Sequence, residues 1–283
     1  NTPTQPVTTT QNQTVVADSA LPPSSAVATS DDLPTSDSAA NLPELNAKPA
    51  NPNLIQVTTD ALDIKIDPRG GDVVSATLLN HDATHLSEEK FVLLSENPQY
   101  IAMSGLVGRN GPDLTVSGRP LYSVDQQNWT LTGNSLVVPL TFVTDEGLKV
   151  EKRFTFKKGK HSIDVDFVVT NNTAEIAEVQ PFYQLKQQLV EHESSMMMPT
   201  YRGGVYSTKD EAYDKYDFDD MEDERLNKNT QGGWVGMIQH YFVSAWVPSQ
   251  DVQNNLYSRM INNNGAAIIG VKSPAVAIQP GQS

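Results

Sequence analysis

Cysteine is absent from the sequence of 283 residues. A chain without cysteine has no disulfide framework, no thiolate zinc site and no cysteine nucleophile. Basic residues are scarce as well: 20 lysines and arginines stand against 34 aspartates and glutamates, for a net charge of −14. Proteins that bind nucleic acid are normally basic where they touch it, so this balance disfavours a nucleic-acid partner.

Long apolar runs are also missing. No stretch approaches the roughly 20 apolar residues that a helix needs to cross a bilayer. The chain begins at Asn1 rather than Met and ends at Ser283. We therefore expect it to be an excised piece of a longer protein.

The first 53 residues contain no Phe, Trp or Tyr and few charges, and they are rich in Thr, Ser, Pro, Gln, Asn and Ala. Such a segment cannot bury enough apolar area to offset the entropy lost on ordering it. We predict a disordered tether over residues 1–53 and a folded domain over residues 54–283.

Within residues 54–283, apolar and polar side chains alternate in one segment after another. Leu62, Ile64 and Ile66, for example, are separated by charged residues, as in a half-buried strand. Gly105–Pro112 is predicted to be a loop because of its glycines. Further strands are predicted at Val73–Leu79, Phe91–Leu94, Gln99–Met103, Ser135–Thr144, Leu148–Phe156, Ile163–Val169, Ile176–Val190, Asn254–Ile261, Ala266–Lys272 and Pro274–Gln279. Many strands joined by short turns, with few helical windows, predict an all-β fold, a large two-sheet sandwich.

The most apolar and aromatic stretch is Gly232–Pro248. Apolar residues on both faces predict a pair of strands buried on both sides at the centre of the sandwich, with Trp234 in the core. A buried helix of similar length is an alternative. The β-branched and aromatic residues, with Gly and Pro at the ends, favour strands.

No motif for catalysis or cofactor binding is present. The glycines between Gly105 and Gly111 do not form a dinucleotide fingerprint, because Pro112 follows and no βαβ unit surrounds them. His81 and His85 are four residues apart, but they lie in a polar stretch that favours a solvated loop over a metal site. His192 is interpreted as a strand-end residue and His240 as a core or edge residue. We therefore predict no catalytic residue, no metal site and no cofactor.

Lys209–Arg225 differs from the rest, because nine acidic residues outnumber three basic ones and aromatic side chains lie between them. One interpretation is a solvated acidic loop. The other is an interaction edge, because Tyr and Phe beside charged residues are typical of protein interfaces.

Several motifs together resemble the periplasmic domain of YidC, the bacterial inner-membrane protein insertase. They occur in order over about residues 54–283: Leu62–Val73, Ser104–Asp113, Gly118–Tyr122, Gln184–Gln187, Arg202–Thr208, Lys215–Tyr216, Gly232–Val235, Tyr241–Pro248 and Gln279–Gln282. The resemblance implies a β-supersandwich fold, similar to galactose mutarotases and carbohydrate-binding domains. It also implies that a transmembrane segment precedes Asn1 and that the insertase core follows Ser283.

The function implied by this resemblance is that of a non-catalytic accessory domain at the periplasmic face of the inner membrane. The implied partners are the SecDF complex, through SecF, the SecYEG translocon and nascent membrane-protein segments. The residues expected to contact a partner are Tyr201, Tyr206, Tyr213, Tyr216 and Phe218. Two other functions stay open: a carbohydrate-binding or mutarotase-like domain on the same sandwich, and a purely structural spacer.

Overall fold

The computed structural model of the chain describes residues 53–84, 87–114, 118–189, 201–239, 241–261 and 265–283. Within these ranges the only helical elements are a short helix, α1 (Phe218–Asp223), and a 3-10 turn at Pro112–Leu114. The all-β class with few helices is therefore confirmed. The predicted tether over residues 1–53 lies, apart from Asn53, outside the described residues.

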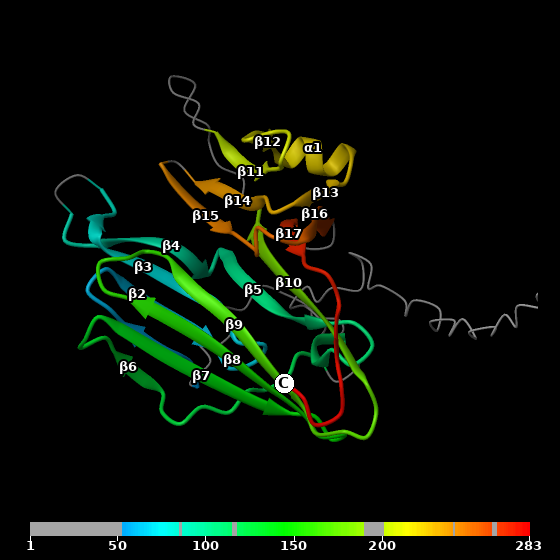
Figure 1. Cartoon of the computed structure of the whole chain (residues 1–283). Helices are drawn as coiled ribbons and strands as arrows, with labels where there is room; N and C mark the ends of the chain where they lie inside the picture. Colours follow the sequence, from blue (N-terminus) through cyan, green and yellow to red (C-terminus); the bar gives the residue numbers. More distant parts are fainter. Residues whose placement is uncertain (1–52, 85–86, 115–117, 190–200, 240, 262–264) are drawn as a thin grey trace, which may run out of the picture.

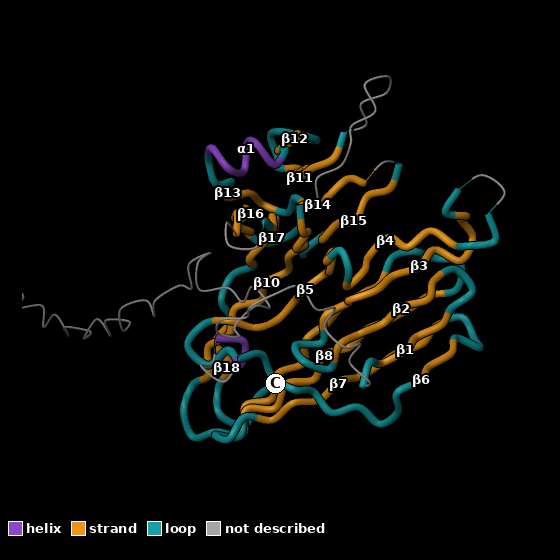
Figure 2. The backbone as a smooth tube through the Cα atoms, turned by 180° about the vertical axis from the view of Figure 1, so that it is seen from behind, coloured by secondary structure: helices purple, strands orange, loops and turns teal. Residues whose placement is uncertain are grey.

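The largest sheet has eleven strands, and Figure 2 shows most of them side by side. Its order is β13-β16-β17-β10-β5-β4-β3-β2-β1-β6, with β18 paired to β10. All neighbours are antiparallel except β1 and β6. The strands are β1 (Ile55–Thr58), β2 (Leu62–Asp67), β3 (Asp72–Asp82), β4 (Lys90–Glu96), β5 (Gln99–Val107), β6 (Asn128–Thr130), β10 (Ala177–Gln188), β13 (Asn227–Gln231), β16 (Gln253–Ile261), β17 (Ala266–Lys272) and β18 (Val276–Ile278).

Two smaller sheets complete the fold. One contains β7 (Ser135–Val143), β8 (Leu148–Lys157) and β9 (Ile163–Asn171), and it lies across one face of the large sheet (Figure 1). The other has the order β12-β11-β14-β15 and lies with α1 at the top of Figure 1. Its strands are β11 (Arg202–Ser207), β12 (Asp214–Tyr216), β14 (Trp234–Gln239) and β15 (Phe242–Trp246).

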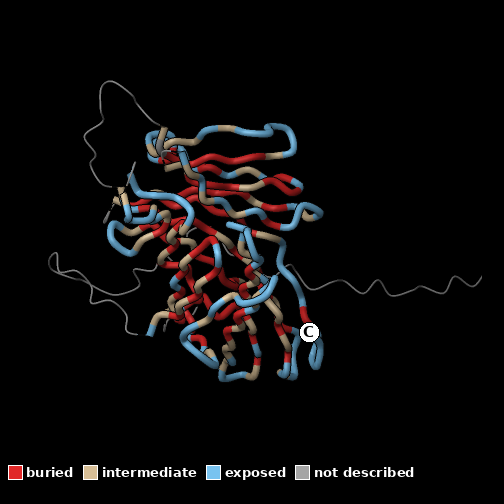
Figure 3. Tube along the Cα trace, turned by 90° about the vertical axis from the view of Figure 1, so that its left-hand side faces the viewer, coloured by how far each residue is buried: buried red, intermediate tan, exposed pale blue. Residues whose placement is uncertain are grey.

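The main core holds buried residues from all three sheets, and much of it lies between the three-stranded sheet and the large sheet; Figure 3 shows the buried stretches of the chain. Strand β8 illustrates the cause: Leu148, Val150, Phe154 and Phe156 occupy alternate positions and are all buried. They belong to the same core cluster as the inward side chains of β1 and β2. Burying side chains of this kind contributes roughly 1.5–3 kcal/mol each, so the alternation both forms the strand and fastens the sheets together.

Most predicted strands are confirmed, including β2 and β8, but the loop predicted to begin at Gly105 is wrong. Strand β5 continues through Leu106 and Val107 and pairs with β10 along that length. Gly105 is needed there for a different reason: an added Cβ would meet the Asp113 carboxylate at 2.4 Å. A glycine inside a strand often marks such a close approach rather than a loop.

The pair of strands predicted in Gly232–Pro248 is confirmed, but the prediction that both strands are buried on both faces is wrong. Strands β14 and β15 pair antiparallel, with Val235 opposite Trp246. In β14, however, only Val235, Gly236 and Met237 are buried, and β15 is an edge strand whose Val243 is 54% exposed. The fully buried strand is β17, in which every side chain is inaccessible to solvent or nearly so. Apolar content alone did not distinguish a central strand from an edge strand.

Trp234 is therefore not a core residue, and its loss is expected to have a modest effect. The side chain is partly exposed, and its ring lies 6.3 Å from that of Tyr213. We expect Trp234→Ala to lower the free energy of unfolding by about 1–2 kcal/mol, below the range for a fully buried aromatic residue. Urea titration followed by far-ultraviolet circular dichroism measures this change. A loss as large as that of a buried phenylalanine would contradict the partial exposure.

Candidate functional site

The five residues predicted to contact a partner lie on β11, β12 and α1 or directly before these strands. Tyr206 is on β11 and Tyr216 on β12, Tyr201 and Tyr213 come immediately before these two strands, and Phe218 is the first residue of α1. The structure nevertheless gives them different environments. Tyr206 is 2% exposed, and its hydroxyl donates to Asp214 at 2.8 Å. Tyr216 packs edge-on against Tyr206 and donates its hydroxyl to the Glu224 carbonyl at 2.6 Å. These two rings mainly support the sheet.

Of the other three members, Tyr201 and Phe218 are partly exposed, as Tyr216 is, and only Tyr213 is classed as exposed. Tyr201 donates its hydroxyl to the Gly204 carbonyl at 2.6 Å, and the Lys215 ammonium lies 4.6 Å from the centre of its ring. Phe218 begins α1 and packs partly on the core. Tyr213, at 52%, is the most exposed of the five. It is therefore the member best placed to contact another protein.

Helix α1 explains why the acidic stretch is folded rather than a loop. Asp217 caps the helix: it accepts from the Asp220 amide at 2.9 Å, while Asp220 accepts from the Asp217 amide at 3.1 Å. Met221 anchors the helix in the core, and acidic residues in the first turn complement the helix dipole. The remaining acidic side chains are exposed, except for that of Asp214, which is partly buried. Together with β12, which ends its sheet, they form an acidic edge with Tyr213 beside it.

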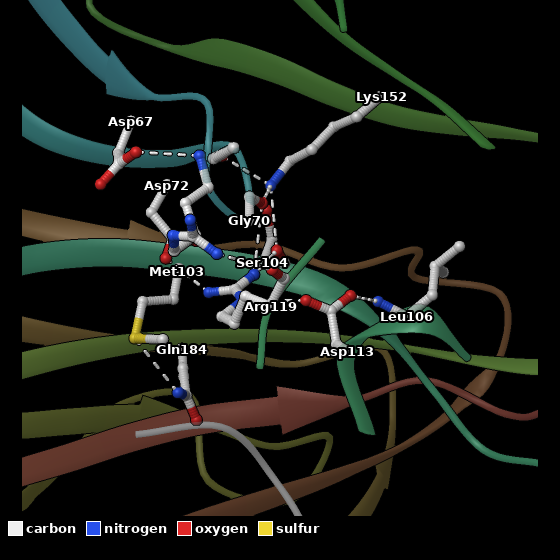
Figure 4. A network of polar contacts seen from close by, with 12 residues as sticks. Asp67, Gly70, Asp72, Met103, Ser104, Leu106, Asp113, Arg119, Lys152 and Gln184 are labelled. Carbon is white, nitrogen blue, oxygen red and sulfur yellow. Dashed lines mark hydrogen bonds and ion pairs between the residues drawn. The ribbon is translucent and has the colours of Figure 1, made fainter. Parts of the chain in front are cut away.

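A second cluster is polar, charged and sealed from solvent (Figure 4). Arg119 donates through Nε to Asp113 at 2.8 Å and through Nη1 to Asp72, and its Nη2 reaches the Ser104 carbonyl at 2.7 Å. Asp113 also accepts from the Leu106 amide at 2.7 Å. Side chains of these three charged residues are at most 7% exposed. One guanidinium thus ties together Asp113, Ser104 and Asp72, of which Asp72 is the most distant from Arg119 in the sequence.

Lys152 reaches the same cluster from β8, on the facing sheet (Figure 4). Its Nζ donates to the carbonyls of Gly70, Gly71 and Ser104 at 3.0, 2.7 and 2.9 Å. The backbone comes close enough because Gly70 and Gly71 both have positive φ, which glycine adopts without strain. The network therefore links the two layers of the sandwich. Sequence reasoning missed it, although Asp72, Asp113 and Arg119 all lie in the motifs quoted above.

Charge and burial compete inside this network. Burial by itself lowers the pKa of the Arg119 guanidinium, but the carboxylates of Asp72 and Asp113 outweigh it and raise that pKa. Burial lowers the pKa of the Lys152 ammonium to about 7, against the opposing influence of Asp72. Burial also raises the pKa of the Asp72 carboxyl. Burial without a direct carboxylate partner therefore makes this lysine lose its proton more easily than an exposed one, even though the three carbonyl acceptors favour the ammonium form.

We expect this lysine to make stability depend on pH. Between about pH 7 and pH 10 the unfolded chain holds a proton on Lys152 that the folded chain has released. The free energy of unfolding therefore rises with pH across this window, by at most about 1.4 kcal/mol per pH unit. The raised pKa of the Asp72 carboxyl has the opposite effect. The folded chain keeps a proton there that the unfolded chain has released, so the free energy of unfolding falls as the pH rises above the ordinary pKa of 3.8.

Urea titrations at several pH values measure the slope. Lys152→Met should abolish the rise above pH 7, whereas Lys149→Met, at an exposed position on the same strand, should leave it intact. The free energy of unfolding of Lys152→Met can be subtracted, at each pH, from that of the unmodified chain. The difference cancels most of the pH dependence that Asp72 contributes to both proteins. Equal slopes in all three proteins would contradict the lowered pKa of Lys152.

A cavity of about 900 Å³ lies between the sheets, and none of the four charged residues of the buried network lines it. His81 and His161 line it, with their ring centres 5.8 Å apart, and His81 also packs edge-on against Phe242 at 5.4 Å. The sequence analysis interpreted His81, with His85, as part of a solvated loop, whereas the structure places His81 in β3. His85, His192 and His240 lie outside the described residues. No three His, Cys, Asp or Glu side chains in the described ranges are arranged to hold a metal ion.

None of the helices in the described part of the chain is long and apolar enough to cross a membrane.

Comparison with known proteins gives consistent results. The family model for the YidC periplasmic domain matches residues 54–283. A protein named membrane protein insertase YidC from Pseudoalteromonas atlantica is 49% identical over 232 residues, which cover 81% of this chain and 42% of that protein. One of the same name from Shewanella pealeana is 45% identical over 281 residues, which cover 98% and 50%. The chain thus spans about half the length of these relatives or less.

Among solved structures, a galactose mutarotase related enzyme from Lactobacillus acidophilus matches 81% of this chain and 93% of its own. The TM-score is 0.47 and the sequence identity is 12%, a level of likeness that carries no argument about activity.

Proposed function

This chain belongs to the YidC periplasmic domain family, and we propose that it serves as a non-catalytic accessory domain of a membrane protein insertase. In this proposal the domain lies at the periplasmic face of the inner membrane and contacts the Sec translocon. SecDF, through SecF, and SecYEG are the proposed partners. The observation that supports the proposal most directly is the family match across the whole folded part of the chain.

The buried network supports a structural rather than a catalytic role for the most strongly perturbed charged groups. Strongly shifted pKa values often mark active sites. Here, however, the groups with shifted pKa values, Asp72, Arg119 and Lys152, are shielded from solvent and bonded to one another, to Asp113 or to backbone carbonyls. A substrate could not reach them without separating the two layers. Their arrangement is suited to holding the sandwich together.

The acidic edge formed by β12 and α1 is the surface we propose for the Sec partner. Exposed acidic residues steer a partner and orient it, while an exposed aromatic ring supplies contact area at low cost in conformational entropy. Tyr213 provides that ring, beside the partly exposed Trp234. The edge therefore combines the two features that favour a specific protein contact.

The test is co-purification of SecDF with the full-length insertase that carries this domain. We expect Tyr213→Ala combined with Asp219→Lys and Glu222→Lys to reduce SecDF recovery by about tenfold, because the contact area and the complementary charge are removed together. Tyr241→Ala is the matched control, since Tyr241 is 86% exposed and lies outside the edge. It should leave recovery unchanged.

Unchanged recovery with the edge variant, at an unchanged melting temperature, would remove this edge from the proposal. Equal loss with Tyr241→Ala would show that the effect is not specific to the edge. The substitutions avoid Tyr206 and Met221, whose burial would confuse loss of binding with loss of folding.

A further inference from the structure

The large sheet has an outer face, turned away from the main core, and part of this face is deeply buried. Cross-strand pairing aligns one residue from each of β5, β10, β17 and β16 in a row, here called the buried row: Ile101, Lys186, Ile268 and Arg259. Their neighbours along the strands, such as Leu185 and Ile269, belong to the main core, so the row lies on the opposite face. The four side chains are at most 9% exposed.

The next row along the same strands is a hydrogen-bonded platform. Tyr257 donates its hydroxyl to Gln184 at 2.8 Å, and Gln184 donates to the Met103 sulfur at 3.3 Å (Figure 4). Tyr257 lies across Gly270, where an added Cβ would meet the tyrosine at 2.5 Å. A glycine in a strand permits such a close approach. This row therefore places an aromatic ring and a methionine beside the buried row.

The helix and the four-stranded sheet pack on the other face of these strands, since Met221 of α1 and Val235 of β14 belong to the main core. On the outer face, the residue just before β1 reaches the buried row: Leu54 packs against a cluster that includes Ile101 and Met103. Burial of the whole row needs more cover than one leucine side chain provides. The residues that precede Leu54 in the chain start from this face and are therefore the nearest candidates.

The chemistry of the buried row indicates what covers it. Lys186 and Arg259 bring two positive charges to it, beside two isoleucines. Glu178, toward the opposite end of β10, is the single acidic residue at the outward positions of these four strands. Burying a cation is costly unless an anionic or hydrogen-bonding group meets it. A segment that fits this surface therefore carries an acidic side chain among apolar ones.

The sequence before Leu54 has this composition. The first acidic residue upstream is Glu44, and Leu42 and Leu45 lie on either side of it. The ten residues from Glu44 to Leu54 span up to roughly 33–36 Å when extended. Four neighbouring strands are about 15 Å wide from first to last. Glu44 can therefore reach any strand of the buried row from the position of Leu54.

We propose that residues 42–52 dock as an extended segment on the outer face of the large sheet. Glu44 pairs with the cations of the buried row, and Leu42 and Leu45 contact its isoleucines and the neighbouring tyrosine and methionine. The folded unit then begins near Leu42, ahead of residue 54 where the family match begins, and the predicted tether shortens to residues 1–41. This contact lies within the chain, so it does not depend on the contacts proposed for the Sec partner.

The absence of cysteine makes the position of residues 42–52 directly measurable, because a single cysteine can be introduced and labelled. A nitroxide spin label at Asn46→Cys should broaden the NMR amide signals of Ile268 and Arg259 in the 283-residue chain, since docking holds the label beside the buried row. The same label at Ser25→Cys, farther along the tether, is the matched control. It should leave both signals intact.

Charge reversal tests the role of Glu44. We expect Glu44→Lys to raise the unfolding equilibrium constant about tenfold, because the segment detaches and its contribution to stability is lost. Asp37→Lys makes the same change of charge outside the docked residues, and it should leave the constant unchanged. Urea titration of the 283-residue chain measures both variants. In the Glu44→Lys background, the label at Asn46→Cys should no longer broaden the buried row.

Four results would overturn the proposal. They are intact signals of Ile268 and Arg259 with the label at Asn46→Cys, equal broadening from Ser25→Cys, unchanged stability of Glu44→Lys, and equal losses in Glu44→Lys and Asp37→Lys. Broadening of the buried row by a label at Glu191→Cys, with none from Asn46→Cys, would assign the cover to residues 190–200 and would likewise overturn it.

Discussion

Replacing Arg119 by leucine is expected to destabilise the domain by about 3–5 kcal/mol, the range measured when one partner of a buried ion pair is removed. The substitution leaves the carboxylates of Asp72 and Asp113 buried without their common cation. It also deprives the Ser104 carbonyl of its donor from Arg119, at 2.7 Å. Total stabilities of domains are about 5–15 kcal/mol, so a loss of this size could unfold much of the population at 37 °C.

Urea titration and thermal melting measure this effect. The matched control is Arg153→Leu on β8, whose side chain is 43% exposed and paired with Glu151, and it should cost less than about 1 kcal/mol. A triple variant, Asp72→Asn, Asp113→Asn and Arg119→Leu, should recover part of the loss because it removes the unpaired charges together. Equal stability of Arg119→Leu and Arg153→Leu would refute the structural role of the network.

Phe154→Ala on β8 is expected to have an effect of similar size, about 3–5 kcal/mol. The ring is fully buried between the two layers, and the Lys152 ammonium lies 5.3 Å from its centre. Its removal leaves a cavity in the main core and takes away a cation–π contact from the buried lysine.

Phe154→Leu retains most of the volume and should cost clearly less than the alanine variant. Trp234→Ala is the second comparison, since it removes a larger side chain from a partly exposed position and should cost only about 1–2 kcal/mol. If Trp234→Ala proved the more damaging of the two, the division between core and edge described here would be wrong.

That division shows where sequence reasoning reached its limit. Gly232–Pro248 was the most apolar stretch, and it was expected at the centre of the sandwich with Trp234 in the core. The strands were identified correctly because their composition is a local property. The edge position of β15 was not, because it depends on which strands pair beside it. The fully buried strand turned out to be β17, in the interior of the large sheet, and its neighbour β10 combines buried apolar residues with the buried polar residues Gln180, Gln184, Lys186 and Gln187.

The partner residues illustrate the same limit. Tyr201, Tyr206, Tyr213, Tyr216 and Phe218 were grouped by their aromatic character among charged neighbours. The structure brings them together, yet it buries Tyr206 and leaves Tyr213 as the most exposed. Exposure depends on β12 pairing with β11 and on Met221 anchoring α1, neither of which the local composition reveals.

The sequence by itself determined the all-β class, most strand positions and, through ordered motifs, the family. Alternation with period two is set by the strand's own geometry, so it can be read without knowing the partner strand. Only the tertiary structure decided that Asp72, Asp113, Arg119 and Lys152 meet, that His81 lies against His161, and that β9 and β15, from different sheets, line one cavity. Each of these depends on contacts between residues far apart in the chain. Such contacts are fixed by how whole sheets pack, because a buried charge is stable only where distant segments bring its partners to it.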